Sequence, residues 1–558
     1  MLGLACTPSG VGLAWTGGLL EGWTAVDVEA ASIVAAIESA LRPRWVWWSN
    51  DTAAKLVASG LRVAMCWDVA AVHRLLFGGW QASPARVWAH LNDLPIDTVP
   101  VMGQLDLLDD AADEGTDRDH PVRPDGHIRP EWTSGGWSAT AERIQAWATL
   151  ARQAAALQQV RLDALTEAPG LSATVKSESA AELLCVELAT DGLPFDTAIA
   201  EHFLAATIGA RPRNDIEAEA ARRRRDAVVM ERGGLGASID LRNPAHVRRM
   251  LAEVGIEVTD TRAWRLEPYR MTHPLVDALL TWRKAERMAT TYGYAWLDTN
   301  VGSDGRLRGV WSGSDGAAGR MTAQAGLHNM PAEMRVAVIA EPGHVFVHAD
   351  LGQIEPRVLA AVSHDPLLTA ATSSEDLYAP IADRLGVARP VAKVAVLAAM
   401  YGQTSGTAGE ALRGLERAYP VAMQFLRDAD RAGQAGRDIR TCGGRLVRMW
   451  IAPDGQENRS AAAARGRYAR NASIQGAAAE LFKAWAVTVR GRGAPLGARI
   501  VLCLHDELLV HVPEAHGPAT VRILEDALPD AAQRWMPGSA VRYVAKASII
   551  RCWADAKG

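Results

Sequence analysis

Residues 501–512, VLCLHDELLVHV, form a mainly apolar run that has His505, Asp506 and Glu507 in its middle. A buried carboxylate is costly unless it is paired or binds a cation. The run predicts two strands joined by a tight hairpin turn at these residues. In an extended chain neighbouring side chains point to opposite faces, so only one of the two carboxylates should face a bound metal. We expect that one to be Asp506. Ordinary turn carboxylates are the alternative interpretation; they would explain the position of the two acids but not their apolar surroundings.

The composition indicates a globular chain without special targeting. The chain has 558 residues, 49% of them hydrophobic, and a net charge of -5, which predicts two or three domains. The near-neutral charge by itself does not indicate a nucleic-acid-binding protein. None of the six cysteines forms a CxxC pair, so neither a zinc site nor a disulfide framework is indicated. No apolar stretch reaches the length of a membrane span. These features favour a reducing cytoplasm.

Apolar periodicity divides the chain into three parts. The first, residues 1–105, combines short strands such as GVGLAW and PRWVWWS with an amphipathic helix, VEAASIVAAIESAL. Residues 109–137 are rich in Asp, Gly and Pro and predict a mobile surface loop, and residues 139–167 predict a long alanine-rich helix. A second part, about 176–300, is mostly helical. From about residue 301 strands, loops and helices mix, and this part carries the chemistry.

A second cluster of chemical interest lies in residues 344–365, HVFVHADLGQIEPRVLAAVSHD. HVFVHA is typical of a buried strand that ends at Asp350, and QIEPRVLAAV predicts a helix with Pro356 in its first turn. Asp350 therefore stands where a strand ends and a helix begins, a common place for a reactive group. A helix-capping aspartate is the alternative interpretation.

A third cluster, RPVAKVAVLAAMYGQ, predicts a helix that Gly402 should end. Arg389, Lys393, Leu397 and Tyr401 recur every four residues and so form one stripe. Both cations lie in the first half of the helix, where the helix dipole favours an anion such as a triphosphate. A solvated basic face is the alternative interpretation.

Taken together, these clusters resemble the three polymerase motifs of the family A DNA polymerases, the bacterial DNA polymerase I family. DLGQIEPR is similar to motif A, RPVAKVAVLAAMYG to motif B and HDE to motif C. Three further segments match: GRMTAQAGLHNMP before motif A, RNASIQGAAAELFK before motif C, and HPLVDALLTWRKAERMATTY at the end of the thumb. The resemblance covers roughly residues 178–558.

The resemblance implies an α+β multidomain fold of the right-hand type, with palm, fingers and thumb. The thumb would span 176–300, the palm 301–365 and 466–558, and the fingers 366–465. Residues 1–175 would form an N-terminal α/β RNase H-like domain of the exonuclease type, with no 5′ nuclease before it. This short form is similar to actinobacterial proteins that combine an exonuclease-type and a polymerase domain.

The implied activity is template-directed DNA synthesis, in which dNMP is transferred from a dNTP to a primer 3′-hydroxyl and pyrophosphate is released. Primer-template DNA and dNTPs would be the partners. Two Mg²⁺ ions would be the cofactor, with Mn²⁺ as a substitute. Two-metal phosphoryl transfer depends mainly on positioning and charge neutralisation. The protein would act as a cytoplasmic, nucleoid-associated monomer without a membrane partner.

The resemblance also assigns roles to single residues. Asp350 and Asp506 would hold the metal ions, with Glu507 close to them but not an essential ligand. Glu355 would be the steric gate against a ribose 2′-hydroxyl, and Gln353 would shape that pocket. The remaining catalytic and nucleotide-binding residues would be Arg389 and Lys393 on the triphosphate, Leu397 facing the nucleotide, Tyr401 where the templating base enters, and His505 beside the primer terminus.

Five further residues match positions that contact DNA. Arg320 and Gln475 would reach the minor-groove edge of the nascent pair, where every correct pair presents acceptors. Donors aimed at those acceptors test the shape of the pair without reading its sequence. Arg467 and Asn471 would lie near the primer-template junction, and Asn329 belongs to the segment before motif A.

Two features depart from the family pattern. Motif B usually carries an aromatic ring where this chain has Leu397, which leaves nucleotide affinity and sugar discrimination open. The N-terminal domain lacks the acids of exonuclease chemistry: its first strands contain none, and no Tyr-x-x-x-Asp occurs in 138–165. Asp27 and Glu29 have the right spacing but follow the strands, and Asp68 is expected to be structural. We therefore expect no 3′–5′ exonuclease activity.

Two other functions fit parts of the pattern. A single-subunit RNA polymerase shares the palm and a related Lys-Tyr helix, but it would normally lack the glutamate of QIE and would not end motif C in glutamate. A non-catalytic DNA-binding protein on a polymerase scaffold is the other alternative. The intact Asp350, Asp506, Arg389 and Lys393 argue against it.

Overall fold

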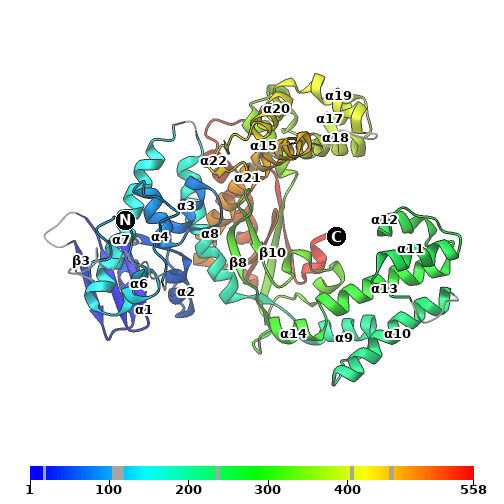
Figure 1. Ribbon diagram of the computed structural model, residues 1–558, viewed down its shortest axis with the longest axis horizontal. Helices are drawn as coiled ribbons and strands as arrows, with labels where there is room; N and C mark the ends of the chain where they lie inside the picture. Colours follow the sequence, from blue (N-terminus) through cyan, green and yellow to red (C-terminus); the bar gives the residue numbers. More distant parts are fainter. Residues whose placement is uncertain are drawn as a thin grey trace. The chain divides into compact units, whose positions relative to one another are not determined.

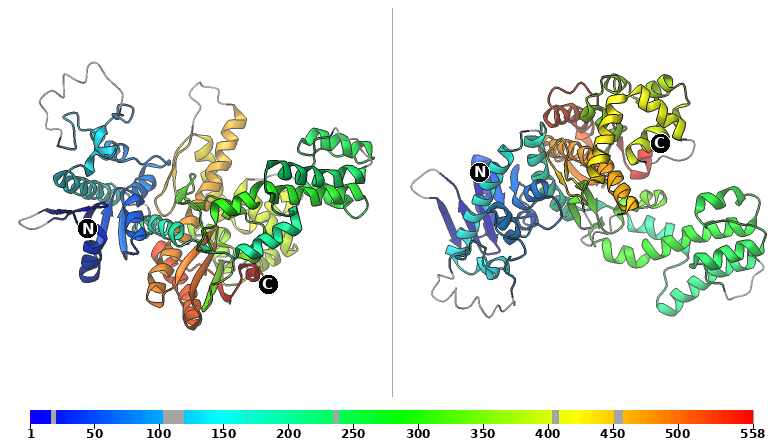
Figure 2. Two further views of the ribbon diagram at one scale, coloured as in Figure 1. Left: turned by 90° about the horizontal axis from the view of Figure 1, so that it is seen from below. Right: turned by 45° about the horizontal axis from the view of Figure 1, so that its top comes forward.

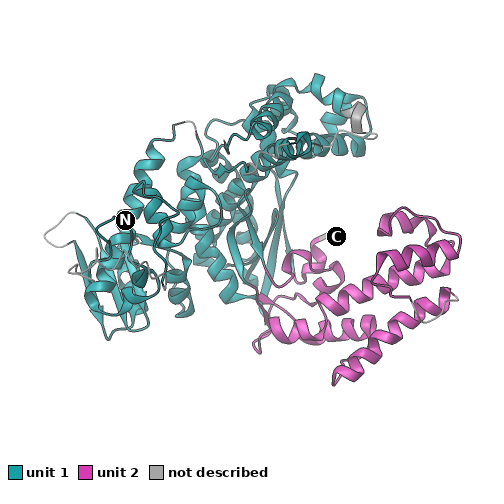
Figure 3. Cartoon of the chain, in the orientation of Figure 1, with its two compact units in different colours: residues 1–192, 310–323, 342–550 teal, residues 193–309, 324–341, 551–558 magenta. Residues whose placement is uncertain are grey.

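The computed structural model describes residues 1–16, 21–102, 119–166, 168–233, 239–402, 408–450 and 458–557. These residues form two compact units (Figure 3). Unit 1 comprises residues 1–192, 310–323 and 342–550, and unit 2 comprises residues 193–309, 324–341 and 551–558. Of the loop predicted at 109–137, residues 109–118 lie outside the described residues.

Unit 1 begins with a five-stranded sheet in the order β3-β2-β1-β4-β5 (Figure 1). Its strands are β1 (Leu2–Thr7), β2 (Gly10–Ala14), β3 (Gly22–Val26), β4 (Arg44–Trp47) and β5 (Met65–Asp68). Strands β1, β2 and β3 pair antiparallel, whereas β1, β4 and β5 run parallel. The strands predicted at GVGLAW and PRWVWWS are thus confirmed as β2 and β4.

The helices around this sheet belong to the same part of the chain. They are α1 (Ala30–Leu41), α2 (Asn50–Ala58), α3 (Val69–Phe77), α4 (Pro84–Leu91), α6 (Pro130–Thr133), the 3-10 helix η1 (Gly136–Ser138) and α7 (Ala141–Asp163). Helix α7 is the predicted alanine-rich helix, and it packs on β1 and β2. Gly12 permits this close approach, because a Cβ there would lie 2.6 Å from the carbonyl oxygen of Ile144.

The second sheet of unit 1 is antiparallel, in the order β13-β14-β10-β15 (Figure 1). Its strands are β10 (His344–Leu351), β13 (Arg499–Leu504), β14 (Glu507–Pro513) and β15 (Ala545–Ile550). Nearly all residues of β13 and β14 are buried, which explains the apolar run in the sequence. The predicted hairpin is confirmed, with His505 and Asp506 as its turn.

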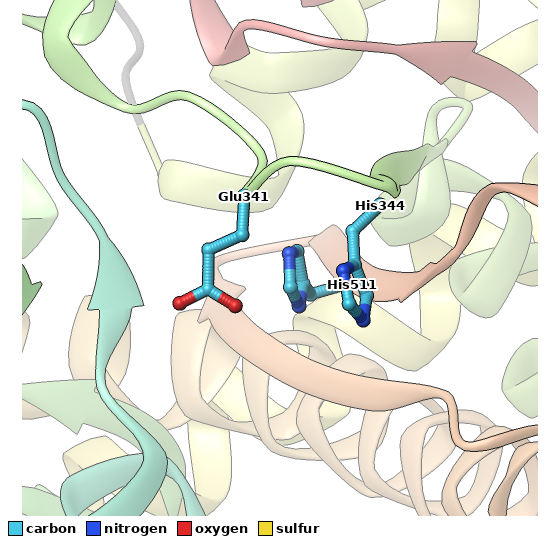
Figure 4. Close-up of side chains that lie close together, drawn as sticks. All are labelled: Glu341, His344 and His511. Atoms are coloured by element: carbon cyan, nitrogen blue, oxygen red, sulfur yellow. The ribbon is translucent and has the colours of Figure 1, made fainter.

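Two histidines stack across this sheet (Figure 4). The rings of His344 on β10 and His511 on β14 lie 4.5 Å apart and 10° from parallel, and the ring of Phe346 packs against His511. Such pairs on neighbouring strands stabilise a sheet. Glu341, also labelled in Figure 4, forms an ion pair with Arg306 at 2.6 Å within unit 2. The packing of the sheet therefore explains the histidine pair.

Two long helices link the sheets of unit 1. Helix α8 (Leu171–Asp191) packs on β5, and α21 (Arg459–Gly493), the long orange helix of Figure 2, packs on α8 and β13. A buried ion cluster fastens α8 to α21, because Glu178 pairs with Arg445 and Lys483 at 2.5 Å each. Burying these charges would be costly without mutual pairing. The N-terminal sheet and the second sheet are therefore parts of one packed unit.

The remaining elements of unit 1 carry or flank the predicted motifs. They are β8 (Trp311–Asp315), β9 (Arg320–Ala323), α15 (Ile354–Ser363), α16 (Pro366–Ala371), α17 (Tyr378–Leu385), α18 (Arg389–Tyr401), α19 (Ala408–Ala418), α20 (Pro420–Gln434), β11 (Ile439–Arg440), β12 (Leu446–Val447), η5 (Ala494–Leu496), η6 (Glu514–His516) and α22 (Gly517–Trp535). The two predicted motif helices are confirmed as α15 and α18. Pro356 lies in the first turn of α15, and Gly402 ends α18 with a φ of +70°.

Unit 2 is mostly helical, as the sequence predicts for this stretch. Its elements are β6 (Leu193–Pro194), α9 (Thr197–Ile208), α10 (Asp215–Gly233), α11 (Pro244–Glu253), α12 (Ala263–Leu266), η2 (Glu267–Tyr269), α13 (Pro274–Thr291), α14 (Tyr294–Asn300), β7 (Arg306–Leu307), η3 (Leu327–Asn329), η4 (Ala332–Ala337) and η7 (Trp553–Lys557). Its core includes Met250, Leu279 and Trp282. Across the described parts of the chain, every helix is too short or too polar to cross a membrane.

Candidate active site

Two carboxylates come together at neighbouring strand ends of the second sheet. Asp350 stands near the end of β10, directly opposite Glu507 on β14, and Asp506 occupies the turn just before β14. The backbone N–H of Leu351 donates to the carbonyl oxygen of Asp506 at 2.9 Å, which ties these segments together. Burial, and next the repulsion from the Asp350 carboxylate, raise the pKa of Asp506 to about 6. The two side chains are therefore close enough to act on each other's charge.

Glu507 is placed differently from Asp506. Its side chain is buried, and its Oε1 lies 2.9 Å from Nε2 of His348. Because the Glu507 carboxylate already pairs with His348 inside the sheet, fewer of its oxygen lone pairs are available to a cation. This placement supports the choice of Asp506 over Glu507 as a metal ligand, and the ligand role itself stays a prediction.

A cavity of about 400 Å³ lies beside the carboxylates, within unit 1. Segments resembling all three polymerase motifs line it, through Gln353, Glu355, Leu397, His505 and Asp506. Gln353 and His505 adopt positive φ angles of 57° and 56°. Such backbone conformations cost energy in residues with a Cβ and cluster at functional sites. The cavity is therefore a place where predicted site residues from all three motif segments meet.

The carboxylate of Glu355 is held by two donors at the wall of this cavity. Nη2 of Arg320 donates to Oε1 at 2.7 Å, and the Tyr401 hydroxyl donates to Oε2 at 3.0 Å. Gln475 on α21 interacts with the same hydroxyl. One hydrogen-bonded network thus joins the residues predicted for the sugar gate, the templating base and the minor groove.

The four residues of the predicted stripe on α18 have different surroundings. At its beginning Arg389 pairs with Asp376, through Nε at 2.5 Å and Nη2 at 3.1 Å. Lys393 is exposed, and Leu397 is half-buried in the cavity wall. At its end Tyr401 reaches Glu355. The stripe therefore leads from an exposed basic end to Glu355.

Asp376 is a site residue that the sequence does not single out. Besides pairing with Arg389, it accepts from Nε2 of Gln353 at 2.8 Å through Oδ1. Its place just before α17 predicts only a helix cap, and the Tyr378 N–H does donate to it at 3.2 Å. No helical or strand spacing connects Asp376 with Arg389. The contact could have been found only from the packing of α17 on α18.

The predicted DNA-contacting residues fall in both units. Arg467, Asn471 and Gln475 are spaced four apart on α21 and so share one face; Arg467 is exposed and the other two are half-buried. Arg320 lies on β9 and lines the cavity. Asn329 ends η3 in unit 2, where its carbonyl oxygen accepts from Nη2 of Arg287 at 3.4 Å.

Comparison with known proteins decides the family. The sequence model of DNA polymerase family A matches residues 235–555. The chain belongs to DNA polymerase family A. DNA polymerase I of Chloroflexus aurantiacus is 31% identical over 315 residues, which are 51% of this chain and 33% of that protein. The thermostable DNA polymerase I of Thermus aquaticus is 28% identical over 296 residues, 48% of this chain and 35% of that protein. The match thus spans about a third of the length of these relatives.

A solved structure shows the same fold. It is the POL domain of Pol1 from M. smegmatis in complex with DNA primer-template and dNTP, with a TM-score of 0.69 at 20% identity. The similarity covers 98% of this chain and 93% of that one. The predicted multidomain polymerase fold is therefore confirmed. That the N-terminal part is of the exonuclease type stays a prediction.

The acids of the second sheet suit the divalent metal ions that family A polymerases generally use. Carboxylate oxygens are hard ligands of the kind that Mg²⁺ and Mn²⁺ prefer. Burial, and after it the like charge of Asp350, raises the pKa of Asp506, and a bound cation would offset that repulsion. The residues present at Asp350 and Asp506 therefore fit a divalent cation.

The first sheet of unit 1 holds no comparable pair. Asp68 is the one acid in strands β1 to β5, all of which the structure describes. It is fully buried, and its oxygens accept from the Ala71 N–H at 2.8 Å and from Nε1 of Trp47 at 3.1 Å. Burial raises its pKa to about 7. Asp27 lies in the turn after β3, and Glu29 precedes α1 and accepts from the Ser32 hydroxyl at 2.7 Å.

Proposed function

We propose that the chain catalyses template-directed DNA synthesis, adding dNMP from a dNTP to a primer 3′-hydroxyl with release of pyrophosphate. The observation that carries the proposal is the cavity where the three motif segments meet, with Asp506 in its wall and Asp350 next to Asp506. Primer-template DNA and dNTPs are the proposed partners. We propose a monomer that works in the cytoplasm, at the nucleoid.

Asp350 and Asp506 are the proposed ligands of two divalent cations, Mg²⁺ or in its place Mn²⁺. When bound, such ions neutralise phosphate charge and activate the primer hydroxyl. The chain contributes two carboxylates on adjoining segments, fixed by the strand pairing and by the Leu351–Asp506 hydrogen bond. Glu507 stays close to them, and His505 is proposed to support the primer terminus.

Arg389 and Lys393 are the proposed binding residues for the triphosphate. Both lie in the first half of α18, where the helix dipole favours anions. Arg389 would exchange the carboxylate of Asp376 for a phosphate, while Gln353 keeps its hydrogen bond to that aspartate. Asp376 thus keeps Arg389 at the mouth of the site until a nucleotide arrives.

Glu355 is the proposed gate against ribonucleotides. Its two oxygens are occupied by Arg320 and Tyr401, so the side chain is held rigidly in the space where a 2′-hydroxyl would lie. Arg320 and Gln475 would donate to the minor-groove edge of the nascent pair, and Tyr401 would pack where the templating base enters. Because Arg320 and Tyr401 both contact Glu355, a change in the position of either residue would also change the position of the proposed gate.

The remaining assignments follow the family pattern. Arg467, Asn471 and Asn329 are proposed contacts to the primer-template, and contacts of arginine with phosphates should make binding strongly salt-dependent. We propose residues 176–300 as thumb, 301–365 and 466–558 as palm, and 366–465 as fingers. Residues 1–175 would be an exonuclease-type domain without exonuclease chemistry.

Extension of a labelled primer-template in Mg²⁺ tests the proposal. The wild-type protein should extend the primer when dNTPs are present. Asp350→Ala and Asp506→Ala should each lower the rate at least about a hundredfold, because several kcal/mol of charge stabilisation are lost. DNA binding should persist in both variants. Asp526→Ala removes an exposed acid on α22 and serves as the control. Near wild-type extension by either site variant would rule out this active site, and DNA binding without extension by the wild type would favour a non-catalytic protein.

A further inference from the structure

Two tryptophans of unit 1 are far more exposed than a large aromatic side chain usually is. Trp80 is 77% exposed and Trp450 71%, which makes them the two most exposed of the 19 tryptophans. Trp80 lies in the connection between α3 and α4, and Trp450 follows β12. Tryptophan dominates binding energetics when its surface is covered. Neither ring takes part in the active-site cavity.

The two tryptophans come from segments that interlock, although 370 residues separate them in the sequence. Nε of Arg448 donates to the Phe77 carbonyl oxygen at 2.9 Å, and Nη2 of Arg440 donates to that of Leu76 at 3.1 Å. A Cβ at Gly78 would lie 2.9 Å from the carbonyl oxygen of Leu446. Each tryptophan stands two residues beyond one of these contacts, and two residues of extended chain span at most about 7 Å.

The surroundings of both rings are basic. Residues 69–92 and 439–450 contain arginines but no Asp or Glu. Arg86 and Arg448 both lie close enough to His90 to lower its pKa, after burial as the larger cause. Arg448 also pairs with Asp438 at 3.1 Å, just before the second segment. We call Trp80, Arg86, His90, Arg448 and Trp450 the Trp80–Trp450 surface.

This surface lies next to the proposed primer-template junction. Met449, the neighbour of Trp450, packs in one cluster with Ala469 and Ala472 of α21. Asn471, a proposed junction residue, directly precedes Ala472 on this helix, so its backbone lies close to that packing although its side chain points to another face. A strand that passes Asn471 would therefore meet the segment of Trp450 nearby.

We propose that the Trp80–Trp450 surface binds the single-stranded template ahead of the primer terminus. Proteins that hold single strands without sequence preference combine basic grooves with aromatic rings on which bases stack. The surface supplies both elements, on two segments fixed to each other by hydrogen bonds. A purely apolar partner protein would not require the arginines beside the two rings. The inference rests on the proposed function, because it is the primer-template that brings the strand to this place.

Equilibrium binding of labelled primer-templates tests the inference. Two substrates share one duplex and differ in the 5′ template overhang, about two or about twelve nucleotides, the longer within the range of single-strand binding sites. The wild-type protein should bind the long-overhang substrate more tightly. Trp80→Ala and Trp450→Ala should each weaken long-overhang binding about five-fold, the low end for loss of one stacked base. The double variant should remove the preference for the long overhang.

Matched variants separate stacking from a general loss of structure. Trp264→Ala removes a similarly exposed ring, 62%, from unit 2 and should leave the preference for the long overhang in place. Trp80→Tyr and Trp450→Tyr keep a stacking ring and should retain most of the preference for the long overhang. An unchanged preference in the double variant would overturn the inference. A change in sedimentation with an unchanged preference would do so as well, and would make the surface a contact between copies of this chain.

The test is separate from that of the proposed function. Extension of the short-overhang substrate reports catalysis alone, and the ratio of the two binding constants reports the surface alone. A protein that extends primers but shows no overhang preference keeps the proposed function and loses the inference. A protein that prefers the long overhang but extends neither substrate loses the proposed function.

Discussion

Each of the two larger sheets of unit 1 has an aspartate at or beside a strand end, and these two aspartates have different partners. Asp68, at the end of β5, accepts hydrogen bonds from the Ala71 N–H and the Trp47 ring nitrogen, and the charge of Glu182, which raises its pKa, is opposed by that of Arg74. Asp506, in the turn before β14, lies near three other acids, Asp350, Glu507 and Glu355. The charge of each of them raises the pKa of Asp506. Burial is the largest cause of the raised pKa at both sites. The hydrogen-bonding partners, rather than the pKa, therefore distinguish a structural carboxylate from a candidate cation ligand.

The largest difference that we expect between the first and the second sheet is in nuclease activity. Because the first sheet offers no pair of neighbouring acids, we expect no shortening of a single-stranded 3′ end in Mg²⁺ or Mn²⁺. The measurement is the length of a labelled strand after incubation with the wild-type protein. Strong shortening that Asp27→Ala and Glu29→Ala abolish, while Asp350→Ala leaves it intact, would show that the N-terminal domain is an active nuclease.

The next contrast is in stability. Asp68→Ala leaves the buried Trp47 N–H and a helix terminus without acceptors, which should cost about 1–3 kcal/mol of unfolding free energy. Asp350→Ala removes an exposed charge that repels Asp506, so its effect should stay within about 0.5 kcal/mol. Melting temperatures of both variants, with Asp68→Asn as the near-isosteric control, measure the difference. A larger loss in Asp350→Ala would reverse the roles given to the two aspartates.

Glu355 shares one feature with each of the two aspartates. It lines the same cavity as Asp506, but, like those of Asp68, its oxygens accept hydrogen bonds from the protein. It should therefore act through its bulk. Glu355→Ala should admit ribonucleotides roughly tenfold better, as expected when one group is removed from a selective pocket. Glu355→Gln keeps the volume and should keep most of the discrimination. The ratio of kcat/KM for dNTP over rNTP is the measurement, and an unchanged ratio in Glu355→Ala would place the gate elsewhere.

The sequence predicts those parts of the site that depend on local pattern. The apolar run with two central carboxylates predicts the β13–β14 hairpin, and the strand-to-helix transition after Asp350 follows from the change in periodicity. The four-residue spacing places Arg389, Lys393, Leu397 and Tyr401 on one face of α18. In each case hydrogen bonding and burial within a short segment decide the structure, so no distant contact has to be known.

The parts that the sequence does not predict depend on contacts between distant segments. Tyr401 and Glu355 are 46 residues apart, and their hydrogen bond exists because α18 brings its last turn to the start of α15. The pair of Glu178 and Lys483 requires α8 to pack on α21. Likewise, nothing in residues 551–558 indicates that they belong with unit 2. Such contacts are set by packing in three dimensions, for which one sequence carries no spacing rule.

Leu397 offers the finest test, because it replaces the aromatic ring that family A enzymes usually have in motif B. The structure places it half-buried in the wall of the cavity that Asp506 and Tyr378 also line. Its neighbour Val394 is 52% exposed, so this side of α18 is not packed into a core. A side chain at 397 therefore meets whatever enters the cavity.

We expect Leu397→Phe to lower the KM for dNTP about five-fold, because stacking on an aromatic ring contributes roughly 1 kcal/mol or more per base. Leu397→Tyr should in addition favour dideoxynucleotides, since its hydroxyl can replace the missing 3′-hydroxyl. Val394→Phe adds a ring one turn away on the exposed side and should leave KM unchanged. Melting temperature and KM, measured on the same variants, distinguish a Leu397 side chain that faces the nucleotide from one that is packed in a core. Overpacking in a core would cost about 1–3 kcal/mol of stability at constant KM, and that result would remove Leu397 from the nucleotide site.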